Sequence, residues 1–387
     1  MAARLYTYAF FEDFVVLYPL YAVLFAETGL SPGEISSLFV IWSVTSFVLE
    51  IPSGLWADVF SRRRLLVIAP LMTGAGFALW TFLPSYPAFA LGFVLWGAGG
   101  ALRSGTLQAL VYEELGRLGA ADSYARLIGR SAAVAATAIM LATALAAPVL
   151  SVGGPAAAGL ASVLATVLTA AVGLSFPESR GETEREDETY LGVLRGGLAE
   201  VRRAAPVRRS LLMLSVVSGL SAMDEYVPLL AGTTGVSAAA VPLLVLMVTA
   251  GVTAGGWLAG RAQGAMAPGL AVAAVCMAVG AAGAAGRHPA AFVLVAVAFG
   301  ILQWAIAAME ARLQDQIDDR SRATVTSMAG LGTETVAVAV FALYAFGSIW
   351  ADSWVLFCVT AVPYLAIALL ARRQPPGGAS TPGDTGT

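Results

Sequence analysis

Long apolar runs recur along the whole sequence and leave little room for any fold outside a membrane. Each run holds about 18–25 mostly apolar residues, the length of α-helix that crosses a bilayer core, and most of the links between runs are short. Charged residues make up 12% of the chain, whereas soluble domains carry about 25%. The sequence therefore predicts an all-α membrane protein with twelve transmembrane helices, at 5–26, 35–57, 65–83, 88–110, 127–148, 155–176, 210–231, 238–260, 268–286, 290–311, 323–347 and 353–371.

One long polar link divides the chain in two. We expect an N-terminal six-helix half, a cytoplasmic central loop, a C-terminal six-helix half and a disordered cytoplasmic tail, at 1–176, 177–209, 210–372 and 373–387. The tail is rich in Pro, Gly, Ser and Thr, a composition that cannot build a core. The segments F-A-E-T-G-L-S at 25–31 and L-A-G-T-T-G-V-S at 230–237 echo each other at the ends of the first and seventh runs. This echo predicts two halves of similar structure.

The arginines predict the orientation of the chain. All 22 basic residues are arginine, and 20 of them fall in cytoplasmic links or nearby helix ends if the N-terminus lies inside. The exceptions are Arg103, within the fourth run, and Arg287, in an outer link. Because cytoplasmic links carry the excess of basic residues, we expect a multi-pass protein of the cytoplasmic membrane with both termini in the cytoplasm.

A few charged residues lie inside the apolar runs, although a charge at the bilayer centre costs about 2.5–3.5 kcal/mol on insertion scales. Glu12 and Asp13 are in the first run, Arg103 in the fourth, and Asp224 and Glu225 in the seventh. Those nearer the cytoplasmic ends are Glu50, Arg130, Glu310 and Glu334. The third, sixth, ninth and twelfth runs contain none, which indicates that the other helices line a polar path.

The buried acids are candidates for handling protons or substrate. A carboxyl group in a dry site favours its neutral form, so it can take up and release a proton as its surroundings change. Adjacent helical residues point about 100° apart, so one member of each acidic pair is expected to face the polar path. Arg103 stays charged and can neutralise Glu12 or Asp13 or bind an anionic group of a substrate. Structural salt bridges and inter-helix hydrogen bonds are the alternative roles.

The link between the second and third runs carries a motif. The segment G-L-W-A-D-V-F-S-R-R at 54–63 resembles the G-x-L-A-D-x-x-G-R-R/K signature that the major facilitator superfamily has between its helices 2 and 3. The matching residues are Gly54, Ala57, Asp58, Arg62 and Arg63, while Trp56 and Ser61 stand where Leu and Gly are usual. The resemblance implies that Gly54, Asp58, Arg62 and Arg63 form a cytoplasmic gate near the start of helix 11, and that every third helix lies outside the bundle.

The resemblance also implies a function. We expect a secondary transporter that exports a small organic solute, a drug or a metabolite, by alternating access in exchange for protons. The alternatives are a proton-coupled uptake symporter or a facilitator, and more remotely a membrane receptor or assembly protein that transports nothing. Expected partners are the solute, protons and the lipid bilayer, with no nucleic acid, and the chain is expected to be a monomer.

Aromatic residues on the predicted inner helices are candidates for stacking on an aromatic or cationic solute, and ordinary packing is their alternative role. The candidates are Tyr18, Tyr21, Trp96, Tyr226 and Trp304. Paired metal ligands, a phosphate-binding loop and a nucleophile–base pair are missing from the sequence. We therefore expect no enzyme, no metal and no cofactor, and a proton gradient as the source of energy.

Overall fold

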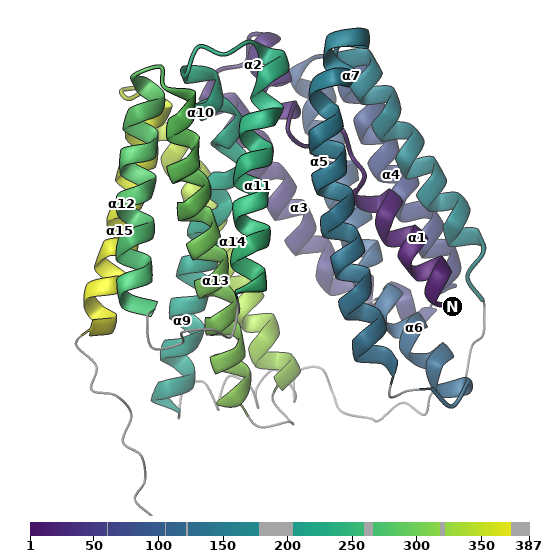
Figure 1. Cartoon of the computed structure of the whole chain (residues 1–387). Helices are drawn as coiled ribbons and strands as arrows, with labels where there is room; N and C mark the ends of the chain where they lie inside the picture. The colour runs from purple at the N-terminus through teal and green to yellow at the C-terminus, as the bar shows by residue number, and fades with distance from the viewer. Residues whose placement is uncertain are drawn as a thin grey trace, which may run out of the picture.

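The computed structural model describes residues 1–59, 61–104, 106–120, 123–177, 204–258, 266–317 and 322–372. These residues form an all-helical bundle of two parts, with α1, α4, α5 and α7 on one side and α9, α12, α13 and α15 on the other (Figure 1). The predicted fold class, twelve transmembrane helices in two six-helix halves, is confirmed. The predicted central loop and tail lie largely outside the described residues. The domain boundaries at 176, 209 and 372 stay predictions.

The N-terminal half contains the first six crossings, some of them broken or joined. Its helices are α1 (Ala2–Asp13), α2 (Tyr21–Glu27), α3 (Pro32–Val59), α4 (Arg62–Phe82), α5 (Tyr86–Arg103), α6 (Thr106–Arg117) and α7 (Tyr124–Leu174). Helix α7 contains the fifth and sixth crossings, which meet at Gly154 with φ of 64°. Glycine suits this left-handed conformation because it has no Cβ, and Pro155 follows it directly.

The C-terminal half begins at Ala205 and again contains six crossings. Its helices are α9 (Ala205–Leu220), η2 (Ser221–Tyr226), α10 (Val227–Thr233), η3 (Ala238–Ala240), α11 (Val241–Trp257), α12 (Met266–Ala285), η5 (Pro289–Ala291), α13 (Phe292–Asp315), α14 (Arg322–Gly347) and α15 (Ser353–Arg372). Among the described residues, seven helices are long and apolar enough to cross a membrane by themselves. The other crossings are shorter helices or pairs of helices in line.

Three predicted helices differ from the structure. The first and seventh were expected to be continuous, but α1 stops at Asp13 and α9 stops at Leu220. The fourth was expected to run from 88 to 110, but α5 ends at Arg103 and α6 starts at Thr106. Ser104 has extended backbone angles, φ −54° and ψ 128°, which stop the helix. Hydropathy alone does not reveal such breaks, because the residues on both sides are apolar.

The two halves repeat the same backbone pattern 206 residues apart. Helix α10 begins and ends 206 residues after α2, and α13 begins 206 residues after α5. Gly29 and Gly235, at the same spacing, both have positive φ angles. The repeat places the break between α1 and α2 at the same point of its half as the break between α9 and α10. Repeated halves with discontinuous helices are typical of secondary transporters.

The halves contact each other through matched helices. Helix α3 packs on α14, α7 packs on α11, and α2 packs on α10. Helices α2 and α10 lie at one end of the molecule, opposite α6 (Figure 1). We call the end that holds α2 and α10 the closed end, because the hydrogen bonds described below join the halves there.

Candidate functional site

The two helix breaks have a clear cause in the sequence. Pro19 lies between α1 and α2, and Pro228 is the second residue of α10. Proline has no N–H to donate to the carbonyl group four residues earlier, so it disfavours a continuous helix at these two points. The free backbone groups find other partners, since the N–H of Leu17 donates to Oγ of Ser162 on α7 at 3.1 Å. Non-helical backbone at membrane depth requires such protein or water partners.

Both breaks carry the acidic pairs. Glu12 and Asp13 are the last two residues of α1, and Asp224 and Glu225 lie in η2, between α9 and α10. The acids are thus held at helix ends, where backbone groups are left without helical partners. The sequence patterns located the acids but not this arrangement.

Glu12 is paired with Arg103. Its Oε1 lies 2.6 Å from Nε of Arg103, and the two side chains are 19% and 42% exposed. Asp13 also interacts electrostatically with Arg103. Of the roles considered for Arg103, the structure places it in an internal ion pair. Being the last residue of α5, it also lies where the helix dipole favours a positive charge.

Tyr18 connects this pair to the second break. Its hydroxyl lies within electrostatic reach of Glu12, Asp13, Arg103 and Glu225. Its ring stacks on Trp96 of α5, with centroids 5.5 Å apart and planes at 19°. Trp96 in turn stacks on Trp42 of α3, with centroids 4.9 Å apart. The three rings are partly exposed, so they form an aromatic surface beside the charged groups.

Tyr21 joins the two halves directly. It is the first residue of α2, and its hydroxyl donates a hydrogen bond to Oε2 of Glu225. Its ring is buried among aromatic side chains that include Phe25, Phe93 and Trp96. We define the central cluster as Glu12, Asp13, Tyr18, Tyr21, Trp96, Arg103 and Glu225. It brings together residues of α1, α2, α5 and η2.

A second hydrogen bond crosses between the halves at the same end. The buried hydroxyl of Tyr226 donates to Oγ of Ser36 on α3 at 2.7 Å. The Tyr226 ring stacks on Tyr344 of α14, with centroids 3.5 Å apart and planes at 11°. Tyr226 is a candidate for stacking on the solute with ordinary packing as its alternative role, and here it is fully buried in the contact between the halves. Ser36 and Tyr344 were not predicted, since nothing in their local sequence marks them.

The remaining predicted acids are not members of the central cluster as defined. Asp224 is exposed, and it interacts electrostatically with Tyr364 of α15. The Tyr364 hydroxyl is buried and has no hydrogen-bond partner among the described residues. Glu310 is exposed near the end of α13, and Glu334 is partly buried on α14.

Trp304, another predicted aromatic candidate, is 9% exposed and belongs to the core of the C-terminal half. A Cβ atom added at Gly269 of α12 would lie 2.9 Å from its ring. The missing side chain at Gly269 thus makes room for the indole between α12 and α13, away from the central cluster.

The predicted gate is described only in part. Gly54 and Asp58 lie in α3, but the side chains of Glu50 and Asp58 lie outside the described residues. Arg62 and Arg63 begin α4, where the Oγ of Ser61 accepts the N–H of Arg64. Arg62 forms a 2.5 Å ion pair with Glu113 of α6, a residue that the motif did not indicate. The gate at Gly54, Asp58, Arg62 and Arg63 stays a prediction.

Comparison with known proteins gives the chain a family and a fold. A model of the Major Facilitator Superfamily matches residues 5–342. The structure is similar to that of a mutant of the nucleoside transporter NupG, with a TM-score of 0.77 and 10% identity over 95% of this chain and 99% of that one.

Two other solved structures are similar in the same way. An auto-inhibited peptide transporter of the POT family gives a TM-score of 0.73 at 14% identity, covering 99% and 98% of the two chains. A D-xylose–proton symporter gives 0.68 at 16% identity, covering 97% of both chains. No curated protein matches the sequence. At these identities the structures share the fold of this chain.

Proposed function

Because the chain belongs to the major facilitator superfamily and is therefore a multi-pass secondary transporter, we propose that it moves a small organic solute in exchange for protons. The observation that carries the proposal is the placement of both acidic pairs at the helix breaks. These breaks occupy equivalent points of the two halves, where transporters of repeated structure bind substrates and coupling ions. Acids inside a membrane-spanning bundle are costly, and this cost supports a functional role for them.

Glu225 is the proposed link between proton binding and the opening of the closed end. A hydrogen bond to a charged carboxylate is about twice as strong as one between neutral groups. Protonation of Glu225 therefore weakens its bond with Tyr21 across the halves and favours opening of the closed end. Protonation of Glu12 likewise weakens its ion pair with Arg103, because a protonated Glu12 no longer neutralises the guanidinium.

The aromatic surface of Tyr18, Trp42 and Trp96 is the proposed contact for the solute. Arg103 is paired with Glu12, so the carboxylates of Asp13 and Glu225 leave the central cluster with an excess of negative charge. This balance favours an aromatic or cationic solute, which stacks on the rings and is attracted by the acids.

The proposed setting is the cytoplasmic membrane, with both termini inside, as the arginines indicate. The closed end then faces outward. Export is the direction that we propose first, and proton-coupled uptake is the alternative. We propose the monomer as the functional unit, since each chain contains both halves.

The test is solute-driven proton movement in liposomes that contain the purified chain and a pH-sensitive dye. A thermal-shift screen first identifies a solute, since a ligand that binds the native state raises its stability. We expect an inward gradient of that solute to drive protons outward, and Glu225→Gln to abolish this movement. Glu27→Gln, at the exposed end of α2, is the matched control and leaves it intact.

The other outcomes separate the alternatives. Protons that move with the solute indicate uptake symport. Solute movement without protons indicates a facilitator and contradicts proton coupling. Binding without movement of any solute contradicts transport and favours a receptor.

A further inference from the structure

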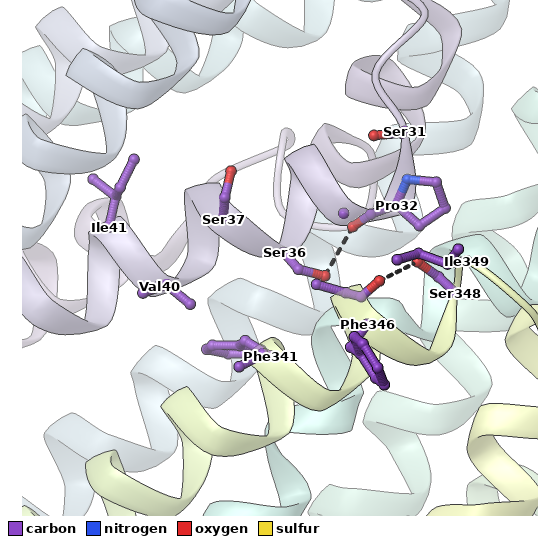
Figure 2. A pocket seen from close by; sticks show the side chains of 13 residues that line it. Ser31, Pro32, Ser36, Ser37, Val40, Ile41, Phe341, Phe346, Ser348 and Ile349 are labelled. Carbon is purple, nitrogen blue, oxygen red and sulfur yellow. Dashed lines mark hydrogen bonds between the residues drawn. The ribbon is translucent and has the colours of Figure 1, made fainter.

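We propose that the groove between α3 and α14 binds an acyl chain of an amine-headed phospholipid from the membrane leaflet at the closed end. The binding is independent of proton coupling. The groove has a volume of about 780 Å³. One wall runs from Ser31, just before α3, to Ile41 on α3, and the other runs from Phe341 on α14 to Ile349, just past its end. Figure 2 shows Ser36 and Val40 on the side of α3 that faces Phe341 of α14. One wall thus belongs to each half.

The length of the groove fits one leaflet. Ten residue steps separate Ser31 from Ile41, which is about 15 Å of helix at 1.5 Å per residue. This is about half of the 30 Å hydrocarbon thickness of a bilayer. Trp350, 68% exposed just beyond α14, packs against Phe346. Exposed tryptophans are enriched at the membrane surface, so the groove runs from that surface towards the middle of the bilayer.

The chemistry of the walls suits hydrocarbon. Val40, Ile41, Phe341, Phe346 and Ile349 supply apolar surface. The serine hydroxyls that also line the groove already donate to protein groups, among them Ser36 to the carbonyl of Pro32 and Ser348 to that of Ala345. A polar solute would lose its hydration here and find few new hydrogen-bond partners, whereas an acyl chain has no hydrogen-bonding groups to desolvate.

The charges beside the groove select the headgroup. Glu34, next to the lining residue Gly33, and Asp352, three residues after Ile349, are both exposed. The stretches 28–44 and 338–352 contain these two acids and no lysine or arginine. An ammonium group at the membrane surface is therefore attracted, whereas phosphatidylglycerol, whose only charge is its phosphate, gains no such attraction. One such charge changes occupancy by about fivefold.

Lipid in the groove should also affect the conformation of the protein. This part of the inference rests on the proposed function. A ligand favours the conformation that it binds better. Because the groove exists only where α3 and α14 of different halves meet, the lipid stabilises the state in which this end is closed. If the lipid binds in the groove but does not favour the closed state, alternating access at this end is contradicted. The proposal of a lipid site is then unaffected.

Photo-crosslinking tests the site directly. The full chain is placed in phosphatidylglycerol nanodiscs with traces of phosphatidylethanolamine that carries a photoreactive group in its acyl chain, and labelled peptides are mapped. We expect labelling of 31–41 and 341–349 to exceed that of exposed segments of α7 and α15. The same probe with a phosphatidylglycerol headgroup should label the groove about fivefold less.

Paired variants make the test specific. Ala342→Trp fills the groove from an exposed lining position and should abolish the excess labelling, whereas Leu343→Trp, outside the lining, should leave it. Gly33→Phe is a second filling variant, because a Cβ there meets no atom closer than 3.9 Å. Uniform labelling, equal labelling by both headgroups, or labelling unchanged in a folded filling variant would overturn the proposal. Displacement of the probe by the transported solute would also overturn it and assign the groove to that solute.

Discussion

At the scale of single residues, the ion pair between Glu12 and Arg103 has the largest expected effect on stability. Groups in direct contact couple by about 0.5–3 kcal/mol, and loss of one partner leaves the other charge at membrane depth. Arg103→Gln and Glu12→Gln should each lower the unfolding temperature in detergent, and the double variant should be less destabilised than the sum. The pair Arg62–Glu113, at the start of α4, is the comparison. Coupling at 12–103 no larger than at 62–113 would contradict the internal role of Arg103.

Tyr21→Phe tests the hydrogen bond between the halves. The variant keeps the ring and removes the donor to Glu225, and a hydrogen bond to a charged group contributes about 1.5–3 kcal/mol. A free energy of about 1.4 kcal/mol corresponds to a factor of ten in an equilibrium. The population in which the closed end is open should therefore rise at least tenfold. Spin labels at Thr28 and Gly232, in a chain with Cys276 and Cys358 replaced by alanine, report the distance between the halves. Tyr86→Phe, whose hydroxyl contacts Ser37 within one half, is the control.

At the scale of helices, close packing of α11 on α13 depends on glycine. A Cβ atom at Gly251 would clash with the backbone carbonyl oxygen of Ala296, whereas one at Gly256 would meet nothing within 4 Å. Overpacking of this kind costs about 1–3 kcal/mol, and alanine otherwise favours a helix by about 0.5–1 kcal/mol. Gly251→Ala should lower the unfolding temperature and Gly256→Ala should hold or raise it. Equal behaviour of the two variants would show that α11 and α13 can separate without loss.

Helix positions were predictable from sequence, but their interruptions were not. Apolar runs located the crossings, because a helix that crosses a bilayer needs about 20 mostly apolar residues. Pro19 and Pro228, which lack an N–H group, lie at the breaks after Asp13 and at Ser221–Tyr226, and hydropathy does not register this. Proline alone does not reveal them either, because α4 and α15 run through Pro70 and Pro363.

At the scale of the whole molecule, contacts between residues far apart in the sequence determine which side chains form the site. Tyr21 and Glu225 are 204 positions apart, and a pattern in one segment does not specify a partner in another. The charged residues of the site were recognised from their cost in a membrane. The burial of Tyr226 and Trp304 could not be foreseen, because it follows from how α14 and α12 pack beside them.

Alternating access requires the closed end to open in each cycle, and this can be blocked covalently. With Cys276 and Cys358 replaced by alanine, Ser36→Cys and Tyr226→Cys place two thiols across the halves, where Oγ and the hydroxyl now lie 2.7 Å apart. Ser37→Cys and Tyr86→Cys form a matched pair within the N-terminal half, where the same atoms lie 2.8 Å apart. A short, reducible cross-linker that reacts with two thiols should abolish solute movement in liposomes for the first pair and leave it intact for the second. Reduction of the linker should restore it. Transport that continues with the halves cross-linked at 36–226 would mean that the solute passes without opening this end, and the proposed mechanism would be wrong.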